Sequence, residues 1–255
     1  MKLLISGLCG HMGNEVAKLA MAGCRGAQID GSVGVDINAC GAEGIPCAHT
    51  FAEASADLSI FGGIDCIVDF SHHSLTCELL DFAVANNLPA VIATTGHTDE
   101  EKAAIYTAAE SIPVFFAANF SLGVALLIDA ARRVAAAMPD AEIEIIEKHH
   151  DRKLDAPSGT ALAIADALCR VRPDATVVTG RHGYGKRTPE EIGIHAIRMG
   201  NIVGEHEVMI GTPNQTITLK HEAHDRALFA EGALAAAEFL CGKSAGLYSM
   251  ADLVK

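Results

Sequence analysis

The chain has 255 residues, of which 50% are hydrophobic and 20% charged, with 24 Gly and no Trp. Such a composition is typical of a soluble globular protein of one or two domains, and it excludes collagen-like, disordered and coiled-coil chains. The 19 Lys and Arg residues against 32 Asp and Glu residues give a formal net charge of -13, so we expect no nucleic acid partner. A few placed cations and backbone amides would have to bind any anionic ligand.

The cysteines and the first residues indicate the compartment. The eight cysteines stand at positions 9, 24, 40, 47, 66, 77, 169 and 241 and form no CxxC pair. We expect them to be reduced, mostly buried thiols, as is typical of a cytoplasmic protein. The apolar run after Lys2 ends at Ser6, which is too short for a signal peptide or a membrane span, so we expect no membrane partner.

Short apolar runs alternate with helical patterns over the first 120 residues. The predicted strands are 2–6, 31–36, 65–70, 89–95 and 113–119, and the predicted helices are 12–22, 74–87 and 99–110. Continuous apolar strands joined by helices indicate a parallel sheet that is covered on both faces. The sequence therefore predicts an α/β fold of the doubly wound, Rossmann-like class.

The pattern changes after residue 121. The predicted elements are a helix at 122–138, a half-buried strand at 142–147, a helix at 158–170, strands at 192–199, 202–210 and 216–221, and a helix at 226–240. The strands with turns between them indicate a separate α+β domain with a mixed or antiparallel sheet. We expect a dinucleotide-binding domain at 1–120, completed by 226–255, and a central domain at 121–225 that binds substrate and forms the oligomer.

A glycine-rich turn, Gly7-Leu8-Cys9-Gly10-His11-Met12-Gly13, follows the first strand and opens the first helix. Such a turn lets the backbone approach a pyrophosphate, whose charge the helix N-terminus offsets. The pattern is GxxGxxG where the dinucleotide fingerprint has GxGxxG. Asp36 ends the second strand, where an acidic side chain accepts hydrogen bonds from the ribose hydroxyls. The alternative is a purely structural glycine turn.

Polar or small residues also follow three further strands. They are Asp69-Phe70-Ser71, Ala93-Thr94-Thr95-Gly96 and Ala117-Ala118-Asn119-Phe120. Because ligands of parallel sheets bind at the carboxyl ends of strands, these segments are expected to line the nicotinamide side of the site. Each alone could be an ordinary loop.

The segment from Glu147 to Thr160 holds the densest group of chemically active residues. His149 is of the residue type best suited to proton transfer, and Lys153 adds a fixed positive charge. Pro157 and Ser158 are typical of a helix start, so backbone amides near Gly159 and Thr160 would be placed to hold a carboxylate. The residues alone leave open whether this is a proton-donating carboxylate pocket or a solvated charged loop.

Two pairs of histidines raise the question of a metal. They are His72-His73 and the stretch His221-Glu222-Ala223-His224. The second pair lacks the HExxH spacing, and no third ligand cluster accompanies either pair. We expect no metal site.

Taken together, these segments resemble the dihydrodipicolinate reductase family, whose members are 4-hydroxy-tetrahydrodipicolinate reductases, over nearly the whole chain. The most specific part is His149-His150-xx-Lys153-x-Asp155-Ala156-Pro157-Ser158-Gly159-Thr160. Further matching segments are the glycine turn, 69–71, 94–96, 117–121, 191–195 and 202–208. The family often has Arg at the position of His11 and Gly at that of Ala93.

The resemblance implies a role for each site residue. His149 would be the catalytic acid and base, Lys153 a proton donor, and His150, Gly159 and Thr160 would bind substrate. The cofactor would lie on Gly7, Leu8, Cys9, Gly10, His11, Met12, Asp36, Ala93, Thr94, Thr95, Ala117, Ala118, Asn119 and Phe120. We expect NADH as the preferred cofactor, NADPH as the alternative, and a homotetramer.

The activity that the resemblance implies is reduction of a hydroxylated cyclic imine to tetrahydrodipicolinate, with loss of water, in diaminopimelate and lysine biosynthesis. One alternative is another two-domain NAD(P)-dependent enzyme, such as an amino acid dehydrogenase. The other is a non-catalytic module that senses a dinucleotide. Neither alternative needs the combination of His149, Lys153 and the segment 157–160.

Overall fold

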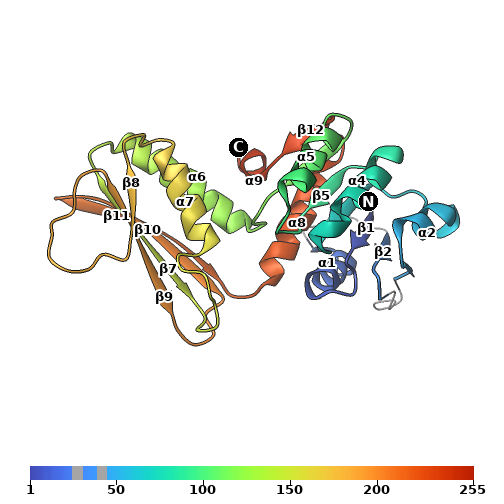
Figure 1. The fold of residues 1–255 in the computed structure, drawn as a ribbon, viewed down its shortest axis with the longest axis horizontal. Helices are drawn as coiled ribbons and strands as arrows, with labels where there is room; N and C mark the ends of the chain where they lie inside the picture. Colours follow the sequence, from blue (N-terminus) through green and yellow to red (C-terminus); the bar gives the residue numbers. More distant parts are fainter. Residues whose placement is uncertain (25–30, 39–44) are drawn as a thin grey trace. The chain divides into compact units, whose positions relative to one another are not determined.

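The computed structural model describes residues 1–24, 31–38 and 45–255, which divide into two compact units (Figure 1). Unit 1 contains residues 1–121 and 227–253 together with Lys255, and unit 2 contains residues 122–226 together with Val254. Unit 1 is thus built from both ends of the chain, and unit 2 is an insertion into it.

Unit 1 is organised around a seven-stranded parallel sheet. Its order is β12-β6-β5-β4-β1-β2-β3. The strands are β1 (Lys2–Ser6), β2 (Gly31–Val35), β3 (Cys47–Ala48), β4 (Cys66–Asp69), β5 (Ala90–Ile92), β6 (Pro113–Phe116) and β12 (Gly246–Tyr248). The chain builds the sheet outward from β1 in one direction as far as β3 and then in the other direction from β4. The doubly wound prediction is therefore confirmed, and the order reverses between β1 and β4.

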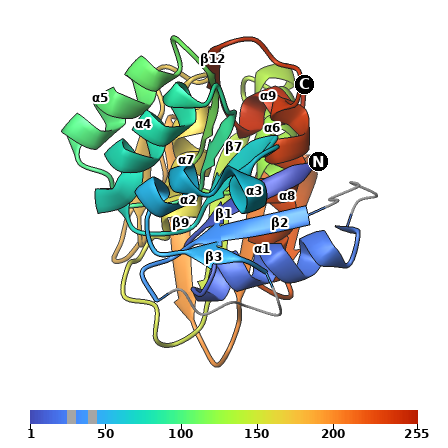
Figure 2. The ribbon, with the colours of Figure 1, turned by 90° about the vertical axis from the view of Figure 1, so that its right-hand side faces the viewer.

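Helices cover both faces of this sheet, as Figure 2 shows for α1, α4 and α5. They are α1 (His11–Met21), α2 (Phe51–Ala56), α3 (Leu58–Phe61), the 3-10 turn His73–Leu75, α4 (Thr76–Ala85), α5 (Asp99–Ala108), α8 (Ala227–Leu240) and α9 (Met250–Leu253). Alternate strand residues such as Leu4, Ile67 and Val114 pack with α2, α4 and α5 in one apolar core. Helix α8 lies on β4, β5 and β6 beside α1, and the ring of Phe115 meets Phe239 of α8.

Unit 2 consists of a five-stranded mixed sheet and two helices. The sheet order is β11-β10-β7-β9-β8, with β7 parallel to β9 and antiparallel to β10. The elements are β7 (Glu142–His149), β8 (Thr176–Thr179), β9 (Glu191–Arg198), β10 (Gly204–Thr212), β11 (Gln215–Ala223), α6 (Leu122–Ala137) and α7 (Gly159–Cys169). The mixed sheet that the sequence predicts is confirmed.

Strand β7 begins in the apolar core of unit 2 and ends at the candidate site. Ile143 and Ile145 are buried against α6 and α7, and Glu147 and His149 continue the same face because side chains of a strand alternate. The apolar face therefore becomes a polar one over the last residues of the strand.

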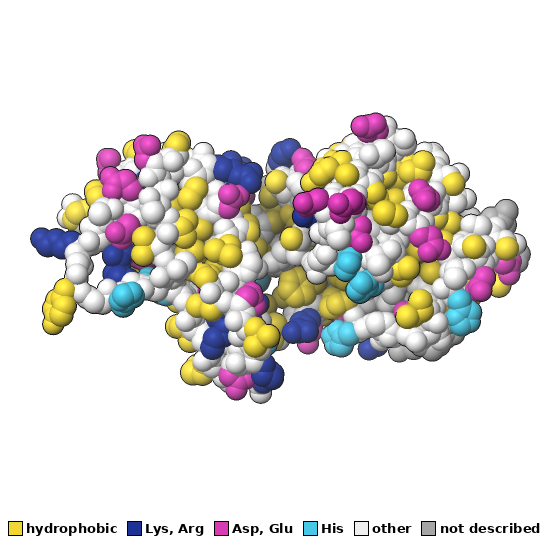
Figure 3. All heavy atoms as spheres, in the orientation of Figure 1, with side chains coloured by type: hydrophobic (Ala, Val, Ile, Leu, Met, Phe, Trp, Pro, Cys, Tyr) yellow, Lys and Arg dark blue, Asp and Glu magenta, His cyan; other side chains and the backbone are white. Residues whose placement is uncertain are grey.

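The cysteine prediction is wrong in two respects. Cys9 is disulfide-bonded, and of the free thiols in the described residues (Cys24, Cys47, Cys66, Cys77, Cys169 and Cys241) only Cys66 is buried. Cys40 lies outside the described residues. No helix in the described ranges is long and apolar enough to cross a membrane. On the face in Figure 3, Lys and Arg side chains are interspersed with Asp and Glu side chains.

Candidate active site

The glycine turn lies between β1 and α1, at the point where the strand order reverses. Gly7 donates to Val35 of β2 (2.9 Å), and Gly10 is the N-cap of α1. Thr50, Thr98 and Ser158 cap their helices with a side-chain oxygen, whereas Gly10 has no side chain to do so. Helix α1 therefore presents backbone amides and the positive end of its dipole to an anion.

The turn packs so closely that side chains would not fit. Gly7 has φ +79°, and a Cβ there would lie 2.7 Å from the carbonyl oxygen of Phe70. A Cβ on Gly13 would lie 2.1 Å from the carbonyl oxygen of Gly7. The glycines thus let the helix start, the turn and the end of β4 approach each other, which is the arrangement that a pyrophosphate cradle requires.

Asp36 follows β2 and meets the turn directly. Its Oδ2 accepts a hydrogen bond from Cys9 N (2.9 Å), and its Oδ1 accepts one from Asn38 N (2.9 Å). The next side chain, Ile37, is 75% exposed. An acidic side chain thus stands beside the glycine turn, where an adenosine ribose is expected, with an apolar residue after it.

Asp69 joins the ends of β4 and β5. This fully buried carboxylate accepts hydrogen bonds from Thr94 Oγ1 (2.7 Å) and from Ser71 Oγ (2.6 Å). The ring of Phe120, which follows β6, contacts Phe70 beyond β4. The structure therefore brings the ends of β1, β4, β5 and β6 to one edge of the sheet.

The predicted cofactor residues of unit 1 differ in exposure. Leu8, Ala93, Thr94 and Phe120 have buried side chains, so Leu8 and Phe120 can meet a ligand only through the backbone. Partly or largely accessible residues are Cys9, Gly10, His11, Met12, Asp36, Thr95, Ala117, Ala118 and Asn119. Asn119 Oδ1 also accepts from Ser121 N (2.8 Å), which fixes the turn after β6.

In unit 2, His149 is the last residue of β7 and its ring is buried. Its Nδ1 lies 2.6 Å from Oε2 of Glu147, a carboxylate with no exposed surface. Arg198, at the end of β9, reaches both oxygens of Glu147 at 2.8 Å. Burial raises the pKa of Glu147, but the hydrogen bonds from Arg198, His149 and Ser158 bring it below its ordinary value. The sequence interpretation did not single out Arg198.

The loop after β7 returns to the start of α7. Ser158 is the N-cap, and its Oγ accepts from Ala161 N (3.2 Å) as its cap-type residue predicts. Lys153 lies in this loop with its Nζ 2.8 Å from Asp155 Oδ1. Lys153, Gly159 and Thr160 thus belong to one short loop and helix start, next in the chain to His149.

His150 is half-buried beside His149. Burial and the nearby cations Arg152 and Arg226 lower its pKa, so the ring is neutral at pH 7. Its Nδ1 is buried and has no hydrogen-bond partner among the described residues. His150 can therefore bind a ligand as a neutral hydrogen-bonding group.

A second buried histidine, His206 of β10, faces the same site. Its ring packs against that of His149 with centroids 5.2 Å apart, and its Nε2 lies 3.1 Å from Ser158 Oγ. Burial, and next the charge of His149, lower the pKa of His206 to about 4. His206 lies in the segment 202–208 that resembles the family, but the sequence interpretation gave it no role; the alternation of β10 places it on the buried face with Val208.

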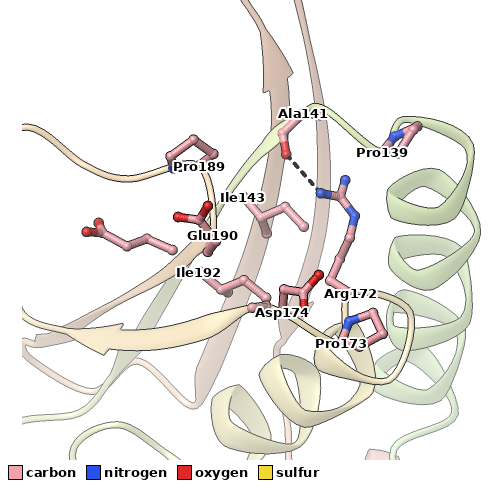
Figure 4. A pocket seen from close by; sticks show the side chains of 11 residues that line it. Pro139, Ala141, Ile143, Arg172, Pro173, Asp174, Pro189, Glu190 and Ile192 are labelled. Carbon is pink, nitrogen blue, oxygen red and sulfur yellow. Dashed lines mark hydrogen bonds between the residues drawn. The ribbon is translucent and has the colours of Figure 1, made fainter.

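Elsewhere, the described residues contain no group of three or more His, Cys, Asp or Glu arranged to hold a metal ion. A pocket in unit 2 lies at the start of β7 and β9, away from His149 (Figure 4). Its Arg172 donates to the carbonyls of Ala135, Met138 and Ala141. This guanidinium therefore caps the C-terminal end of α6, and we do not assign it a ligand-binding role.

A doubly wound unit with a glycine turn at its switch point, and a second unit with a buried histidine held by a buried carboxylate, are the features of two-domain NAD(P)-dependent oxidoreductases. The chain belongs to the dihydrodipicolinate reductase family. The family model described as "Dihydrodipicolinate reductase, N-terminus" matches residues 1–120, and that described as "Dihydrodipicolinate reductase, C-terminus" matches residues 123–254.

Individual relatives agree with this assignment. The 4-hydroxy-tetrahydrodipicolinate reductase of Caldanaerobacter subterraneus subsp. tengcongensis is 43% identical over 256 residues, covering 100% of this chain and 98% of the relative. The enzyme of the same name from Alkaliphilus metalliredigens is 41% identical, covering 100% and 99%. A solved structure of dipicolinate-bound dihydrodipicolinate reductase from Paenisporosarcina sp. TG-14 is similar with a TM-score of 0.79 and 26% identity, covering 98% of this chain and 97% of that chain.

Proposed function

We propose that this chain reduces 4-hydroxy-tetrahydrodipicolinate to tetrahydrodipicolinate with a reduced nicotinamide cofactor, in diaminopimelate and lysine biosynthesis. The names of its full-length relatives support the proposal. The structural observation that carries it is the set of residues at the end of β7. The buried His149 is hydrogen-bonded to Glu147 there, and the loop that follows contains Lys153 and leads to the start of α7, which Ser158 caps.

The cofactor fits unit 1. The nicotinamide supplies the hydride, and the protein has to bind and orient the cofactor and the substrate and to supply a proton. The amides at the start of α1 and the side-chain-free turn of Gly7, Gly10 and Gly13 would hold the pyrophosphate. Asp36 would hold the ribose, and the segments after β4, β5 and β6 would hold the nicotinamide end, with Asp69 fixing Thr94 in place.

The substrate fits the loop of unit 2. It is a dicarboxylate, and the structural relative from Paenisporosarcina binds dipicolinate, which is one as well. Lys153 would meet a carboxylate as a cation, and the amides of Gly159 and Thr160 would meet it at the helix start. His150 would donate or accept one further hydrogen bond. His149 and Lys153 would supply the protons that reduction and loss of water require.

We further propose NADH as the preferred cofactor, because the Asp36 carboxylate would repel a 2'-phosphate and the exposed Ile37 offers it no charge. We also propose a cytoplasmic homotetramer, which the family resemblance implies. Light scattering on the purified chain tests the tetramer directly, and a monomer or dimer mass at assay concentration contradicts it.

A coupled assay tests the activity. Aspartate semialdehyde, pyruvate and the upstream synthase generate the substrate, and the fall in reduced-nicotinamide absorbance is followed with and without this chain. The expected result is oxidation that needs both the synthase and this chain. Absorbance that stays constant with both proteins present contradicts the proposal.

A further inference from the structure

Glu147 is a fully buried carboxylate whose hydrogen bonds come from three segments of unit 2. Oε2 accepts from His149 Nδ1 (2.6 Å) and from Arg198 Nη1 (2.8 Å). Oε1 accepts from Ser158 N (3.0 Å) and from Arg198 Nη2 (2.8 Å). The strand β7, the end of β9 and the start of α7 therefore converge on one side chain.

We propose that Glu147 and Arg198 are positioning residues that set the tautomer and ring orientation of His149, so that Nε2 is its proton-transferring nitrogen. This inference rests on the proposed function for its catalytic meaning. An ionised carboxylate only accepts hydrogen bonds, so the 2.6 Å contact requires the proton on Nδ1. Nε2 is then left free to take up or release a proton.

The surroundings of Nε2 agree with this assignment. Gly204 of β10 lies beside it, and a Cβ at that position would stand 3.1 Å from His149 Nε2. A side chain there would crowd the nitrogen that has to reach the substrate. The glycine thus keeps a side chain away from His149 Nε2.

Arg198 makes the buried carboxylate tolerable. A buried charge without a partner is costly, and a bidentate guanidinium is the geometry that best compensates a carboxylate. Arg198 also donates to the carbonyl of Asp155, which links the pair to the loop that carries Lys153. Glu147 thereby stays ionised at neutral pH, as its lowered pKa agrees.

Other titratable groups approach His149 from β10, from β9 and from the loop after β7. His206 of β10 packs against its ring and, with a pKa of about 4, is neutral at pH 7. Lys153 follows in the loop, and Arg198 faces it from β9 through Glu147. Glu147 is the group in hydrogen-bond contact with Nδ1, so the tautomer depends on it.

The same carboxylate also holds the helix start. Ser158 N donates to Oε1 while His149 Nδ1 donates to Oε2. A single side chain thus fixes both the acid–base nitrogen and the first turn of α7, where we expect the substrate carboxylate. The distance between His149 Nδ1 and Ser158 N is therefore limited by the size of one carboxylate group.

The variant Glu147→Gln tests the inference because it replaces one oxygen by an NH2 group of the same size. The backbone N–H of Ser158 can only donate, whereas an imidazole nitrogen can become an acceptor. The amide NH2 should therefore turn toward His149, which shifts its proton to Nε2. We expect kcat to fall about a hundredfold, because the acid–base nitrogen is then wrongly protonated, while the KM for the cofactor stays unchanged.

Nitrogen NMR on the ligand-free protein gives a readout that does not depend on activity. With ¹⁵N-labelled histidine, the His149 signals are assigned by their loss in His149→Gln. At pH 8 we expect the Nδ1–H tautomer in the wild type and its loss in Glu147→Gln. Arg198→Lys should retain part of both kcat and the tautomer, whereas Arg198→Met should lose both.

Glu144→Gln is the matched control. Glu144 lies on the same strand, and its Oε2 lies 2.8 Å from His195 Nε2 on the opposite face of the sheet. We expect this variant to keep the kcat, the pH profile of kcat and the His149 signals of the wild type. If the loss of any Glu–His contact on β7 lowered kcat, Glu144→Gln would lower kcat as much as Glu147→Gln does.

A folded Glu147→Gln that keeps the wild-type kcat, pH profile and His149 tautomer overturns the inference. If Glu147→Gln does not fold, Arg198→Lys and Arg198→Met decide in its place, and unchanged tautomers in both overturn it as well. A wild type that shows the Nδ1–H tautomer but does not reduce the substrate refutes the proposed function and leaves the assignment of the tautomer standing.

Discussion

Lys153 and Asp155 form an ion pair within the loop that joins β7 to α7, with 2.8 Å between Nζ and Oδ1. The pKa of the Asp155 carboxyl lies below its ordinary value, first because of Lys153 and further because of the Gly159 N–H. An internal carboxylate thus engages two of the groups that we expect to bind a substrate carboxylate. We therefore expect a bound dicarboxylate to compete with Asp155 for these groups.

The variant Asp155→Asn removes this competition. We expect pyridine-2,6-dicarboxylate to bind up to about fivefold more tightly, since an exposed ion pair is worth at most about 1 kcal/mol. Isothermal calorimetry measures the change. Asp151→Asn, whose carboxylate pairs with Arg152, is the control and should bind as the wild type does. Weaker binding by Asp155→Asn would mean that Asp155 supports the site rather than competes for it.

Removal of either proposed proton donor should reduce turnover. His149→Gln or Lys153→Ala is expected to lower kcat by about a hundredfold or more, which is the usual scale for a lost general acid, with cofactor binding nearly unchanged. Steady-state kinetics in the coupled assay and fluorescence titration of the cofactor measure the two. Arg152→Ala removes a neighbouring exposed cation and should leave kcat unaltered. Near-normal turnover in His149→Gln would refute its role.

The helix start can be tested one amide at a time. Gly159 is the first residue of α7, a position where proline is tolerated, and Ser158 has the extended backbone that precedes proline (ψ 151°). Gly159→Pro removes the N–H and should weaken competitive inhibition by the dicarboxylate about tenfold or more. Gly159→Ala keeps the N–H and meets no atom within 4 Å, so it should resemble the wild type.

Thr160→Val tests the next residue of the same helix start. It exchanges the hydroxyl for a methyl group of similar size, and we expect weaker inhibition by the dicarboxylate. The inhibition constant is measured under the conditions used for Gly159→Pro. If calorimetry on the double variant Gly159→Pro, Thr160→Val gives the wild-type affinity, the carboxylate binds elsewhere.

The proposed preference for NADH predicts how the kcat/KM values for the two cofactors compare. The kcat/KM for NADH over NADPH should exceed one, by about tenfold to a hundredfold, because Asp36 repels the phosphate and Ile37 contributes no charge. In Asp36→Ala, Ile37→Arg this ratio should fall steeply. Kinetics with both cofactors on both proteins decide it. A wild-type preference for NADPH would contradict the proposed role of Asp36.

His206 predicts a pH dependence of stability. Its pKa falls from 6.5 to about 4 on folding, so between these values the unfolded chain binds more protons than the folded one. The stability that it contributes is complete above pH 6.5 and is lost as pH falls toward 4, by about 3 kcal/mol at most. Glu147 acts in the same direction, but only below pH 4.5.

Urea unfolding from pH 7.5 to 4 measures this dependence. His206→Gln can keep the contact with Ser158 and does not titrate, so its free energy of unfolding should fall less steeply than that of the wild type between pH 6.5 and 4. Parallel curves for the two proteins would show that His206 does not sense this change.

The alternation of strands and helices in unit 1 could be predicted because strands buried on both faces leave continuous apolar runs. The short strands β3 and β12 could not, since two or three residues carry no periodicity. The predicted strand at 89–95 ends at Ile92, because Thr94 turns to the buried Asp69 instead of continuing the ladder.

In the candidate site, motifs that lie within one segment could be predicted from the sequence, whereas contacts between residues far apart in the sequence could not. The glycine turn and the loop from His149 to Thr160 each lie within one segment. The contact of Glu147 with Arg198 spans 51 residues and exists only because β7 pairs with β9. One signal was present, since Glu147 shares the buried face of β7 with Ile143 and Ile145, where a charge needs a partner.

Helix α8 comes from the end of the chain yet belongs to the interior of unit 1. Most of its residues from Ala230 to Leu240 are buried, and a Cβ on Gly232 would lie only 1.7 Å from the carbonyl oxygen of Phe120. During synthesis the ribosome therefore releases the first 121 residues without the helix that covers β4, β5 and β6. Unit 2 is made in one piece before that helix exists, so unit 1 begins first and is completed last.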